Sequence, residues 1–466
     1  MRKKGKERVL SIALANGLDV RLREHFEKGP GQEDLTFAFW RPSKGIERTT
    51  AVLHELALPN DGERILAGNV AFTSDYLIRV LGIVPEGSGI ALIHSHIGPG
   101  WQGMSDDDIV AERDRLAEVV EGHTRLPLVG MTWGTDGAWS GRFWERERPR
   151  IYSLHWASSV RVVGRHLRMT FHPTLLPSVR STKFQTATVS VWGNENQSII
   201  SRLRVGVVGL GSVGSIVAEA LSRIGVSKIT LIDHDYIEPR NIYRTLGTTR
   251  RDARRRIRKV EVGERLITAS HTASKMDIRV IDKSLLSEEG LAAAMDCDVL
   301  FSCVDRPFPR HVLNALAYGH LIPVIDGGIL ARVHEGEFLH ADWRIHTVGP
   351  EYGCMICTGA LQREAISLDQ AGLLDDPVYI ERLGPLLNPL LTRQNVFPFS
   401  LSVASHEVLQ FIGLVTGDQR IGGVGPQFYH CYPGMMEVSP SVGCSDGCEY
   451  AALTALATDL SRNIES

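Results

Sequence analysis

Residue types that bind metal ions gather between positions 94 and 108. His94 and His96 stand one residue apart at the end of an apolar stretch, and Asp108 follows a glycine-rich segment. Side chains at i and i+2 of a β-strand point the same way, so both imidazoles can bind one metal ion. An aspartate from the helix that comes next can complete a three-ligand site with one open position, the arrangement of catalytic zinc. The structural alternative is two histidines with satisfied hydrogen bonds near a surface loop.

A glycine-rich turn provides a second candidate centre. Gly209, Gly211 and Gly214 follow the β-branched stretch 205–208 and lead into a helical stretch. The first glycine permits a tight turn, the second lets the backbone approach a phosphate, and the third allows close helix–strand packing. Asp233 ends the next predicted strand, 19 positions after Gly214, where an acid can bind a ribose hydroxyl. The pattern predicts a nucleotide site, with the phosphates at the helix N-terminus.

Charged side chains further along favour phosphate chemistry over hydride transfer. Asn241, Arg244 and Lys259 follow the second strand closely, and Asp305 ends a later apolar strand. A dehydrogenase does not need a guanidinium and an ammonium to converge on a polyphosphate. An adenylating enzyme does, because negative charge builds up on the α-phosphate and on the leaving pyrophosphate. A strand-end cap at Asp305 and solvated basic side chains are the structural alternatives.

Four of the seven cysteines form two short-spaced pairs, Cys354 with Cys357 and Cys444 with Cys448. Two such pairs can make a tetrahedral zinc site that is structural, because all four positions are filled. Isolated core thiols are one alternative. A redox role for the first pair is another, although the surroundings are not those of a thioredoxin-like motif.

Bulk composition excludes some classes of function. A chain of 466 residues with 43% hydrophobic and 23% charged residues predicts two to four globular domains. A net charge of −3 argues against nucleic-acid binding, and no apolar stretch or signal-peptide pattern indicates a membrane protein or a secreted one. We therefore expect a cytoplasmic protein. A local basic run at 250–259 is either a phosphate-binding surface or a solvated helix face.

The elements that must position these residues differ between the two halves of the chain. Residues 35–40 and 89–93 are predicted strands, and 106–120 shows the apolar spacing of a helix. From position 203 the pattern alternates strand, glycine turn, helix and strand, which is typical of an α/β parallel sheet. The expected domain organisation is an N-terminal domain at 1–150, a connector at 151–200, a nucleotide-binding domain at 201–350 and a C-terminal part of that domain with the cysteine pairs at 351–466.

The second half resembles the ubiquitin-activating superfamily, which includes the ThiF/MoeB-type adenylyltransferases of thiamin and molybdopterin biosynthesis. The resemblance rests on the glycine turn, the Asp-x-Asp…Asn-x-x-Arg run, a later lysine and a strand that ends in an acid, and it covers roughly residues 203–333. It implies a Rossmann-like adenylation domain that binds ATP and Mg²⁺ and is usually dimeric. It further implies that Asp233 holds the ribose, that Asn241, Arg244 and Lys259 contact phosphates, and that Asp305 helps to hold Mg²⁺.

The N-terminal third resembles the JAMM/MPN+ metallopeptidases, whose signature is His-x-His, a spacer and Ser-x-x-Asp. The spacer here has eight residues, 97–104, where seven are usual, and the proline that usually follows the second histidine is shifted to Pro99. The resemblance implies catalytic Zn²⁺ on His94, His96 and Asp108, with Ser105 hydrogen-bonded to the oxyanion. It also implies a general-base glutamate on an early strand. Glu33 is our first choice, ahead of Glu55 and Glu63.

Two features depart from the pattern of the activating enzymes. The stretch 184–191, before the first strand, has no arginine that could reach a neighbouring subunit's nucleotide. In addition, no cysteine lies between Cys357 and Cys431, where a thioester cysteine is expected. Cys431 is one candidate, whereas Cys297 and Cys303 are predicted to be core residues. The chain either stops at the adenylate or passes it to another protein.

The predicted fold class is α/β, with a JAMM-type metallopeptidase domain followed by a Rossmann-like adenylation domain and a zinc-stapled C-terminal part. The expected substrate is a bacterial ubiquitin-like protein that ends in glycine. One half would activate its carboxylate and the other would mature or deconjugate it, together with a conjugating enzyme or another acceptor. One alternative is a sulfur-carrier protein in cofactor or metabolite biosynthesis. A catalytically inactive scaffold that binds the modifier is the third.

Overall fold

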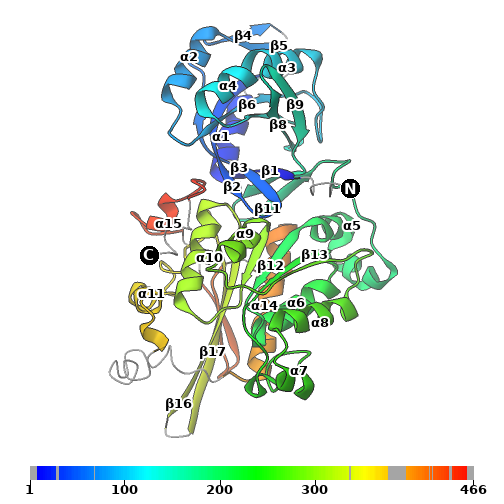
Figure 1. Cartoon of the computed structure of the whole chain (residues 1–466), viewed down its shortest axis with the longest axis vertical. Coiled ribbons are helices and arrows are strands. Elements are labelled where there is room, and N and C mark those ends of the chain that lie inside the picture. The colour runs from blue at the N-terminus through cyan, green and yellow to red at the C-terminus, as the bar shows by residue number, and fades with distance from the viewer. Residues whose placement is uncertain are drawn as a thin grey trace.

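The computed structural model describes residues 8–27, 31–67, 69–334, 337–375, 395–418, 420, 421, 423, 425–439 and 443–458. They form two α/β units that stack along the long axis of the molecule (Figure 1). The N-terminal unit contains a nine-stranded sheet and the second unit an eight-stranded one.

The N-terminal sheet has the strand order β11-β10-β1-β3-β2-β6-β7-β8-β9. Every residue of β6 is buried because helices cover both faces of the sheet. Ile90 and Leu92 pack under α2 and α4, whereas Ala91 and Ile93 pack under α1. The strands are β1 (Val9–Ala15), β2 (Leu35–Lys44), β3 (Arg48–Ala57), β6 (Gly89–Ser95), β7 (Leu128–Trp133), β8 (Trp139–Arg148), β9 (Ile151–Trp156), β10 (Ser159–Val163) and β11 (Leu167–Phe171), and a separate pair consists of β4 (Arg64–Ala67) and β5 (Asn69–Phe72).

The helices of this unit are α1 (Asn16–Phe26), α2 (Ser74–Ile83), α3 (Asp106–Ile109) and α4 (Ala117–Thr124). A π-helical segment, η1 (Val110–Leu116), joins α3 to α4. The predicted strands at 35–40 and 89–93 and the predicted helix at 106–120 are therefore confirmed. The π-helical segment was not predicted, and it carries the fully buried Glu112.

The prediction of a connector at 151–200 is wrong. Strands β9, β10 and β11 belong to the N-terminal sheet, and β10 pairs in parallel with β1, with Ser11 opposite Ser159. The segment lacks a clear apolar period because it carries polar side chains such as the buried Arg161 toward the second unit. The N-terminal unit therefore extends to about Phe171. After η2 (Lys183–Gln185), α5 (Thr186–Arg202) packs Ile200 into the core of the second unit.

The second sheet has the order β14-β13-β12-β15-β16-β17-β18-β19; the first five strands are parallel to one another, and β17, β18 and β19 are then added by antiparallel pairing. Helices cover both faces, as the predicted α/β rhythm requires. The strands are β12 (Arg204–Val208), β13 (Lys228–Ile232), β14 (Asp277–Ile281), β15 (Val299–Ser302), β16 (Val324–His334), β17 (Glu337–Val348), β18 (Gln427–His430) and β19 (Met435–Val438), and the helical segments are α6 (Ser212–Arg223), η3 (Pro239–Asn241), α7 (Arg250–Arg255), α8 (Lys259–Ser270), α9 (Glu288–Met295), α10 (Pro307–Gly319), α11 (Arg363–Gln370), η4 (Leu373–Asp375), α14 (Phe397–Thr416) and α15 (Glu449–Ala452).

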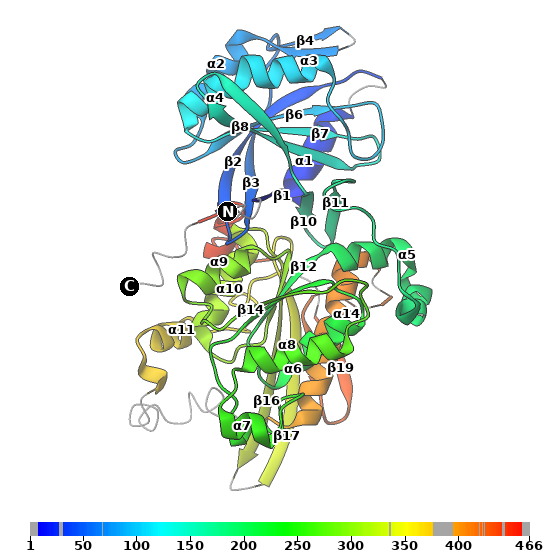
Figure 2. The ribbon, with the colours of Figure 1, turned by 45° about the vertical axis from the view of Figure 1, so that its right-hand side comes forward.

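The 20-residue helix α14 is long and apolar enough to cross a membrane, and it is the one such helix within the part of the chain that the structure describes. It packs against α6, β16 and β17, and 61% of its most apolar 18-residue stretch is buried inside the protein. We therefore assign it as a core helix. Figure 2 shows it beside α6, with the β16–β17 hairpin running past both to the far end of the molecule.

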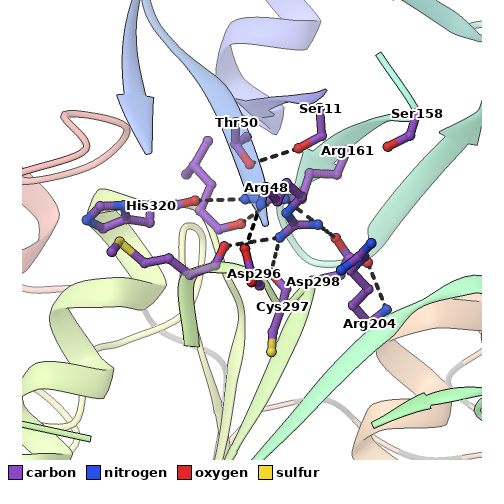
Figure 3. A network of polar contacts seen from close by, with 12 residues as sticks. Ser11, Arg48, Thr50, Ser158, Arg161, Arg204, Asp296, Cys297, Asp298 and His320 are labelled. Carbon is purple, nitrogen blue, oxygen red and sulfur yellow. Dashed lines mark hydrogen bonds and ion pairs between the residues drawn. The ribbon is translucent and has the colours of Figure 1, made fainter. Parts of the chain in front are cut away.

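Buried charges join the two units. The Arg48 guanidinium pairs with the Asp298 carboxylate and donates to the Cys297 carbonyl oxygen, and Arg161 donates to the Leu321 carbonyl at 3.0 Å (Figure 3). Asp296 accepts the Arg48 backbone N–H at 2.8 Å. These contacts lie at the amino end of β15, so the second sheet presents its carboxyl ends away from the N-terminal unit.

Candidate functional site

The three predicted metal ligands of the N-terminal unit converge. Nε2 of His94 lies 3.1 Å from Nε2 of His96, and these atoms are 3.3 and 3.5 Å from the two carboxylate oxygens of Asp108. The donor atoms all lie within 4.8 Å of one another. Two imidazoles and a carboxylate are a donor set that suits zinc. His94 is buried, whereas His96 is half-buried.

Ser105 sets the position of Asp108. Its Oγ accepts the Asp108 N–H at 3.1 Å, and its own N–H donates to the Asp108 carboxylate at 2.8 Å, which makes a capping box at the start of α3. Because the Ser105 oxygen acts here as an acceptor, the hydroxyl proton is available to donate elsewhere. The helix cap and the metal-ligand geometry therefore use the same two residues.

Glu33 lies beside this cluster. The next residue, Asp34, donates its N–H to Ser95 Oγ at 3.0 Å and accepts the Ser95 N–H at 3.0 Å, so the peptide next to Glu33 is fixed against the His94–His96 segment. The Asp108 carboxylate raises the pKa of His96, and the Glu33 charge adds to this rise. Glu33 itself is half-buried.

The two other candidate glutamates are placed differently. Glu63 accepts two hydrogen bonds from Arg79, at 2.7 and 2.6 Å, and this pair lowers the pKa of Glu63 to about 2. Glu55 is exposed on β3. Of the three candidates, Glu33 is the one whose charge acts on a predicted metal ligand.

A buried pair behind the cluster was not foreseen from the sequence. Arg142 and Glu112 are fully buried and pair with each other, and Arg142 Nη1 donates to Thr132 Oγ1 at 2.8 Å. Thr132 Oγ1 in turn lies 3.4 Å from His94 Nε2. This pair was hard to predict because Glu112 and Arg142 are 30 positions apart and because η1 interrupts the helical spacing of apolar residues.

The glycine turn has the geometry that its sequence predicts. Gly209 has a φ of +90°, and a Cβ there would lie 2.6 Å from the Cys303 carbonyl oxygen. A Cβ at Gly214 would overlap the Gly209 carbonyl oxygen, so the start of α6 packs directly on the turn. A Cβ at Gly211 would meet no atom within 4 Å among the described residues, so the backbone is open to an approaching group. Each glycine is therefore required for a different reason.

Asp233 and Lys259 meet beside this turn. The Asp233 carboxylate accepts the Leu210 N–H at 2.6 Å and the Asp235 N–H at 2.8 Å, so it holds the turn and the loop after β13 together. Lys259 Nζ lies 2.6 Å from the Asp235 carboxylate and 3.9 Å from that of Asp233. The ammonium group is thus fixed at the carboxyl end of β13.

The two other predicted phosphate ligands, Asn241 and Arg244, differ in burial and in hydrogen bonding. Asn241 is buried, and its side-chain oxygen accepts the Glu238 N–H at 2.8 Å, so it caps η3 in this structure. Arg244 is half-buried, with its guanidinium 5.7 Å from the centre of the Tyr243 ring. The basic run after these residues forms α7 and its flanks, where Arg256 and Arg258 lie over the Tyr236 ring.

Asp305 is exposed in the loop between β15 and α10. β12 and β15 are neighbouring parallel strands, and Cys303 donates its N–H to the Val208 carbonyl at 2.9 Å, so this loop lies next to the glycine turn. The chain leaves β12 toward β13 on one side and returns to β15 on the other. Such a switch point in strand order is where open α/β sheets bind ligands.

Two sets of polar residues near this point were not recognised as site residues from the sequence. Asn395 donates to Ser212 Oγ at 2.8 Å and so joins the segment before α14 to the start of α6. Asp326, on β16, pairs with Arg310 of α10 and Arg344 of β17. Asp326 and Arg344 belong to neighbouring strands 18 positions apart, and no short motif connects them.

The four paired cysteines gather at one point, with their sulfur atoms within 4.8 Å of one another. Cys354 Sγ lies 3.7 Å from Cys448 Sγ, and the Cys354 N–H points to Cys444 Sγ at 3.2 Å. A set of four sulfurs fits structural zinc. Asn314 of α10 accepts the Met355 N–H at 3.1 Å and so joins this cluster to α10.

The three other cysteines are separate thiols. Cys297 is fully buried, as predicted, and burial raises its pKa to about 12. Cys303 is half-buried under the glycine turn, where burial also raises its pKa. Cys431 is exposed and donates its N–H to Ala341 on the β17 strand. Its role as a thioester cysteine stays a prediction.

Known proteins share features with part of this chain. Ubiquitin-like modifier-activating enzyme 5 of Drosophila mojavensis is 28% identical over 168 residues, which cover 34% of this chain and 40% of that protein. The enzyme of the same name from Drosophila willistoni is 30% identical over 143 residues, or 28% of this chain and 34% of that one. The chain thus spans well under half the length of these relatives. The solved structure of E. coli MccB with ATP aligns at a TM-score of 0.45 and 17% identity, over 58% of this chain and 74% of that chain.

A family model described as the ThiF family matches residues 183–421, just over half of the chain. The match begins before α5 and runs past α14, so it takes in the glycine turn, Asp233, Lys259 and Asp305. The chain belongs to the ThiF family.

Proposed function

We propose that this protein uses ATP to adenylate the C-terminal carboxylate of a ubiquitin-like protein. The observation that carries the proposal is the convergence of the glycine turn, Lys259 and Asp305 at the switch point of the second sheet. Membership of the ThiF family supports it, as do the relatives named as ubiquitin-like modifier-activating enzymes.

In this reaction a carboxylate oxygen attacks the α-phosphorus of ATP. A new P–O bond forms, the bond between the α-phosphorus and the bridging oxygen breaks, and pyrophosphate leaves with the electron pair. The open backbone at Gly211 and the N-terminus of α6 would bind phosphate oxygens. Lys259 and Arg244 would stabilise the charge that builds up on the leaving group.

Magnesium fits the same place. Asp305 is an exposed carboxylate at the end of β15 beside the glycine turn, and hard oxygen donors are what Mg²⁺ takes. Asp305 would hold the ion, and the ion would supply charge neutralisation between phosphates. Lys259 and Arg244 would orient the phosphates on the other side of the turn.

Exchange of labelled pyrophosphate into ATP tests this proposal. Small glycine-terminated proteins encoded near this gene are the substrates to be tried, each added in excess with Mg²⁺. Exchange should depend on the added protein, and Asp305→Asn should reduce it at least a hundredfold. The matched control Asp277→Asn alters an exposed aspartate on β14 and should leave exchange unchanged. Exchange that persists in Asp305→Asn contradicts the assignment.

We propose a second activity for the N-terminal unit, a zinc-dependent peptidase of the JAMM/MPN+ type. The observation that favours it is the convergence of His94, His96 and Asp108 beside Glu33. Zinc bound to these three side chains would supply Lewis acidity to hydrolysis. Glu33 would take the proton of the attacking water and pass it to the leaving amine. The free hydroxyl proton of Ser105 would be donated to the carbonyl oxygen as it gains charge.

The two activities suit one substrate. Cleavage of the peptide bond that follows the glycine, or of an isopeptide bond formed by that glycine, releases the carboxylate that the second unit would adenylate. A bacterial conjugation pathway with a conjugating enzyme fits this combination, and a sulfur-carrier pathway is the alternative. Genes for a conjugating enzyme next to this one favour the first, and biosynthetic genes the second. We also propose structural zinc on the four cysteines, a homodimer and a cytoplasmic location.

Metal analysis tests both zinc sites. The purified protein should contain two zinc ions per chain. Substitution of His96 by alanine should remove one and abolish peptidase activity, whereas pyrophosphate exchange should survive. If His96→Ala keeps both ions, the N-terminal cluster is not a zinc site.

A further inference from the structure

The basic run of the sequence forms an arginine-rich surface on α7. Five of its side chains are exposed, those of Arg250, Arg251, Arg254, Arg255 and Arg256. Positions i and i+4 are neighbours on a helix, so Arg250 and Arg254 share one face of α7, and Arg251 and Arg255 share the next. The positive charge therefore covers two adjoining faces of one short helix.

Most of these guanidinium groups have no partner within the protein. Arg254 Nε donates to the Arg250 carbonyl oxygen at 3.3 Å, and Arg256 lies 5.2 Å from the centre of the Tyr236 ring. In the described part of the chain, the side chains of Arg250, Arg251 and Arg255 make no hydrogen bond, ion pair or ring contact. Like charges at i and i+4 of a helix repel each other. Carboxylates of another molecule would relieve this repulsion.

The acid within α7 is already neutralised. Asp252 is buried and accepts hydrogen bonds from Arg265 Nη1 and Nη2 at 3.0 and 2.8 Å. Thr249 Oγ1 donates to the same carboxylate at 2.7 Å. The hydrogen bonds from Arg265 lower the pKa of Asp252 well below its ordinary value. Asp252 is thus committed to α8 and does not balance the exposed arginines of α7.

A hollow of about 490 Å³ opens between α7 and α8. Arg251 and Arg255 line it from one face of α7, and the exposed Glu261 lines it from α8. Asp252 and Arg265 also line the hollow, but they balance each other. Glu261 then offsets one of the two remaining arginines, so the hollow keeps one net positive charge. The arginines around its rim add to this charge.

Two tyrosines extend the arginine surface. Tyr243, in the loop before α7, is 58% exposed, and Tyr236 is 37% exposed. Arginine and tyrosine are enriched in protein–protein interfaces and are frequent among the residues that dominate their binding energy. We refer to these two tyrosines and the five exposed arginines as the α7 surface. Its composition is that of a surface for binding a protein.

The α7 surface is continuous with the adenylation centre. The Ile237 N–H donates to the Ile257 carbonyl at 2.8 Å, and the Lys259 N–H donates to the Asp235 carbonyl at 3.0 Å. The chain that leaves α7 is therefore fixed against the loop after β13, where Lys259 lies. Four residues separate Arg255 from Lys259, which is roughly 14 Å at most along the chain. Figure 1 shows α7 at the end of the second unit that lies away from the N-terminal unit.

We propose that the α7 surface is the docking site for an acidic face of the protein whose C-terminal carboxylate is adenylated. This role rests on the proposed adenylation. Arginines on two faces of a helix spread wider than one phosphate group can contact, whereas a protein surface with several carboxylates can pair with all of them. The net charge of −3 of the whole chain argues against nucleic acid as the occupant.

The position of the surface suits delivery of a C-terminal tail. An extended tail of six residues spans roughly 20 Å. A partner held on α7 can therefore place its last residue beside Lys259 while its folded part stays outside the nucleotide site. Complementary charge would also raise the rate at which the two proteins meet.

Peptide binding tests the surface without requiring catalysis. The probes are two fluorescein-labelled twelve-residue peptides, one of alternating glutamate and glycine and the other of alternating glutamine and glycine. They are titrated with the full chain by fluorescence anisotropy. We expect the acidic peptide to bind at least tenfold more tightly than the neutral one. The double substitution Arg251→Glu with Arg255→Glu should reduce this ratio below twofold. Equal binding of the two peptides by the wild type, or an unchanged ratio in the double variant, overturns the proposal.

Further variants separate a lost surface from a damaged fold. Arg251→Gln with Arg255→Gln removes the two charges without reversing them and should lower the ratio at least threefold, so it decides the matter if the glutamate variant does not fold. Arg146→Glu with Arg148→Glu reverses two exposed arginines of β8 in the N-terminal unit and should leave the ratio unchanged.

Pyrophosphate exchange then tests whether the docked partner is the substrate. With the glycine-terminated protein that supports exchange, Arg251→Glu with Arg255→Glu should raise the KM for that protein at least tenfold. The kcat and the KM for ATP should stay within twofold of the wild type. For the wild type, the KM for the protein should rise with salt, because salt screens exposed charges, and the variant should lose this dependence. An unchanged KM for the protein, or an equal rise in the KM for ATP, overturns the proposal.

Two other outcomes are informative. A 20-base-pair DNA duplex that binds below about 1 µM at about 150 mM NaCl, without discrimination between the peptides, would make this a nucleic-acid surface and overturn the proposal. Discrimination between the peptides without pyrophosphate exchange would refute adenylation and keep the acidic docking surface. Exchange with an unchanged KM for the protein would do the reverse.

Discussion

The two candidate centres of this chain are assembled from different lengths of sequence. In the N-terminal unit, fifteen consecutive positions supply His94, His96, Ser105 and Asp108, and only Glu33 comes from elsewhere. In the second unit the glycine turn follows β12, Lys259 opens α8 and Asp305 follows β15, and 96 positions separate Gly209 from Asp305. A local motif therefore defines the first centre almost completely, whereas sheet topology defines the second.

The centres also face away from each other. The interface between the units lies at Arg48 and Asp298, at the amino ends of β3 and β15. His94 pairs with Leu35, the first residue of β2, whereas the β2–β3 turn contacts the second unit. At about 3.3 Å per residue, the length of β2 separates the N-terminal cluster from the interface by roughly 30 Å. The glycine turn lies on the opposite side of the interface, so neither centre supplies residues to the other.

The largest expected effect tests whether the centres are independent. Glu33→Gln should lower the proposed peptidase rate by about 10²–10⁴-fold, because it removes the proposed general base. Zinc content and pyrophosphate exchange should stay as in the wild type, since Glu33 lies on the far side of the N-terminal unit. Glu55→Gln, at an exposed site on β3, is the matched control. An equal fall in exchange in Glu33→Gln would show that the centres are coupled.

This difference between a local motif and sheet topology explains which site residues could be predicted from the sequence. The glycines, Asp233 and Lys259 could be placed because each follows a strand or opens a helix, and parallel strands bring such ends together. Asp326 and Arg344 could not, because their pairing depends on the antiparallel register of β16 and β17, which no local pattern specifies. The side-chain oxygen of Asn241 caps η3 in this structure, and the role of Asn241 as a phosphate ligand stays a prediction.

The boundary of the N-terminal unit was misplaced for a related reason. β10 and β11 are only five residues long and expose one face to the other unit, so their side chains alternate between core and interface. Arg161 looks like a surface residue in the sequence, yet it is buried against the His320 and Leu321 carbonyls. Because the interface buries charged side chains, the strands that form it lack the alternating apolar pattern by which strands are predicted.

A substitution at the interface between the two units is expected to have a smaller effect, on stability and not on activity. Arg48→Met leaves Asp298 buried with Arg161 at 3.6 Å as its remaining cation. Loss of one partner of a buried pair costs about 3–5 kcal/mol, and chemical denaturation should show this as a lower free energy of unfolding. Both centres are remote from Arg48. At denaturant concentrations below the unfolding midpoint, the specific rates of peptide hydrolysis and of pyrophosphate exchange should therefore equal those of the wild type. Arg420→Met, at an exposed pair with Asp418, should leave the midpoint unchanged. A selective loss of one activity in Arg48→Met would mean that the interface shapes that centre.

The smallest effects distinguish the glycines of the nucleotide turn. Gly214→Ala places a methyl group against the Gly209 carbonyl oxygen, and such overpacking costs about 1–3 kcal/mol of stability. Gly211→Ala meets no described atom within 4 Å and should unfold like the wild type. Its methyl group nevertheless stands where a phosphate would approach, so calorimetry should show ATP binding weakened by about tenfold, or roughly 1.4 kcal/mol. If Gly211→Ala binds ATP as the wild type does, the open backbone is not the phosphate site, and the second centre would then have to be sought on the other side of β15.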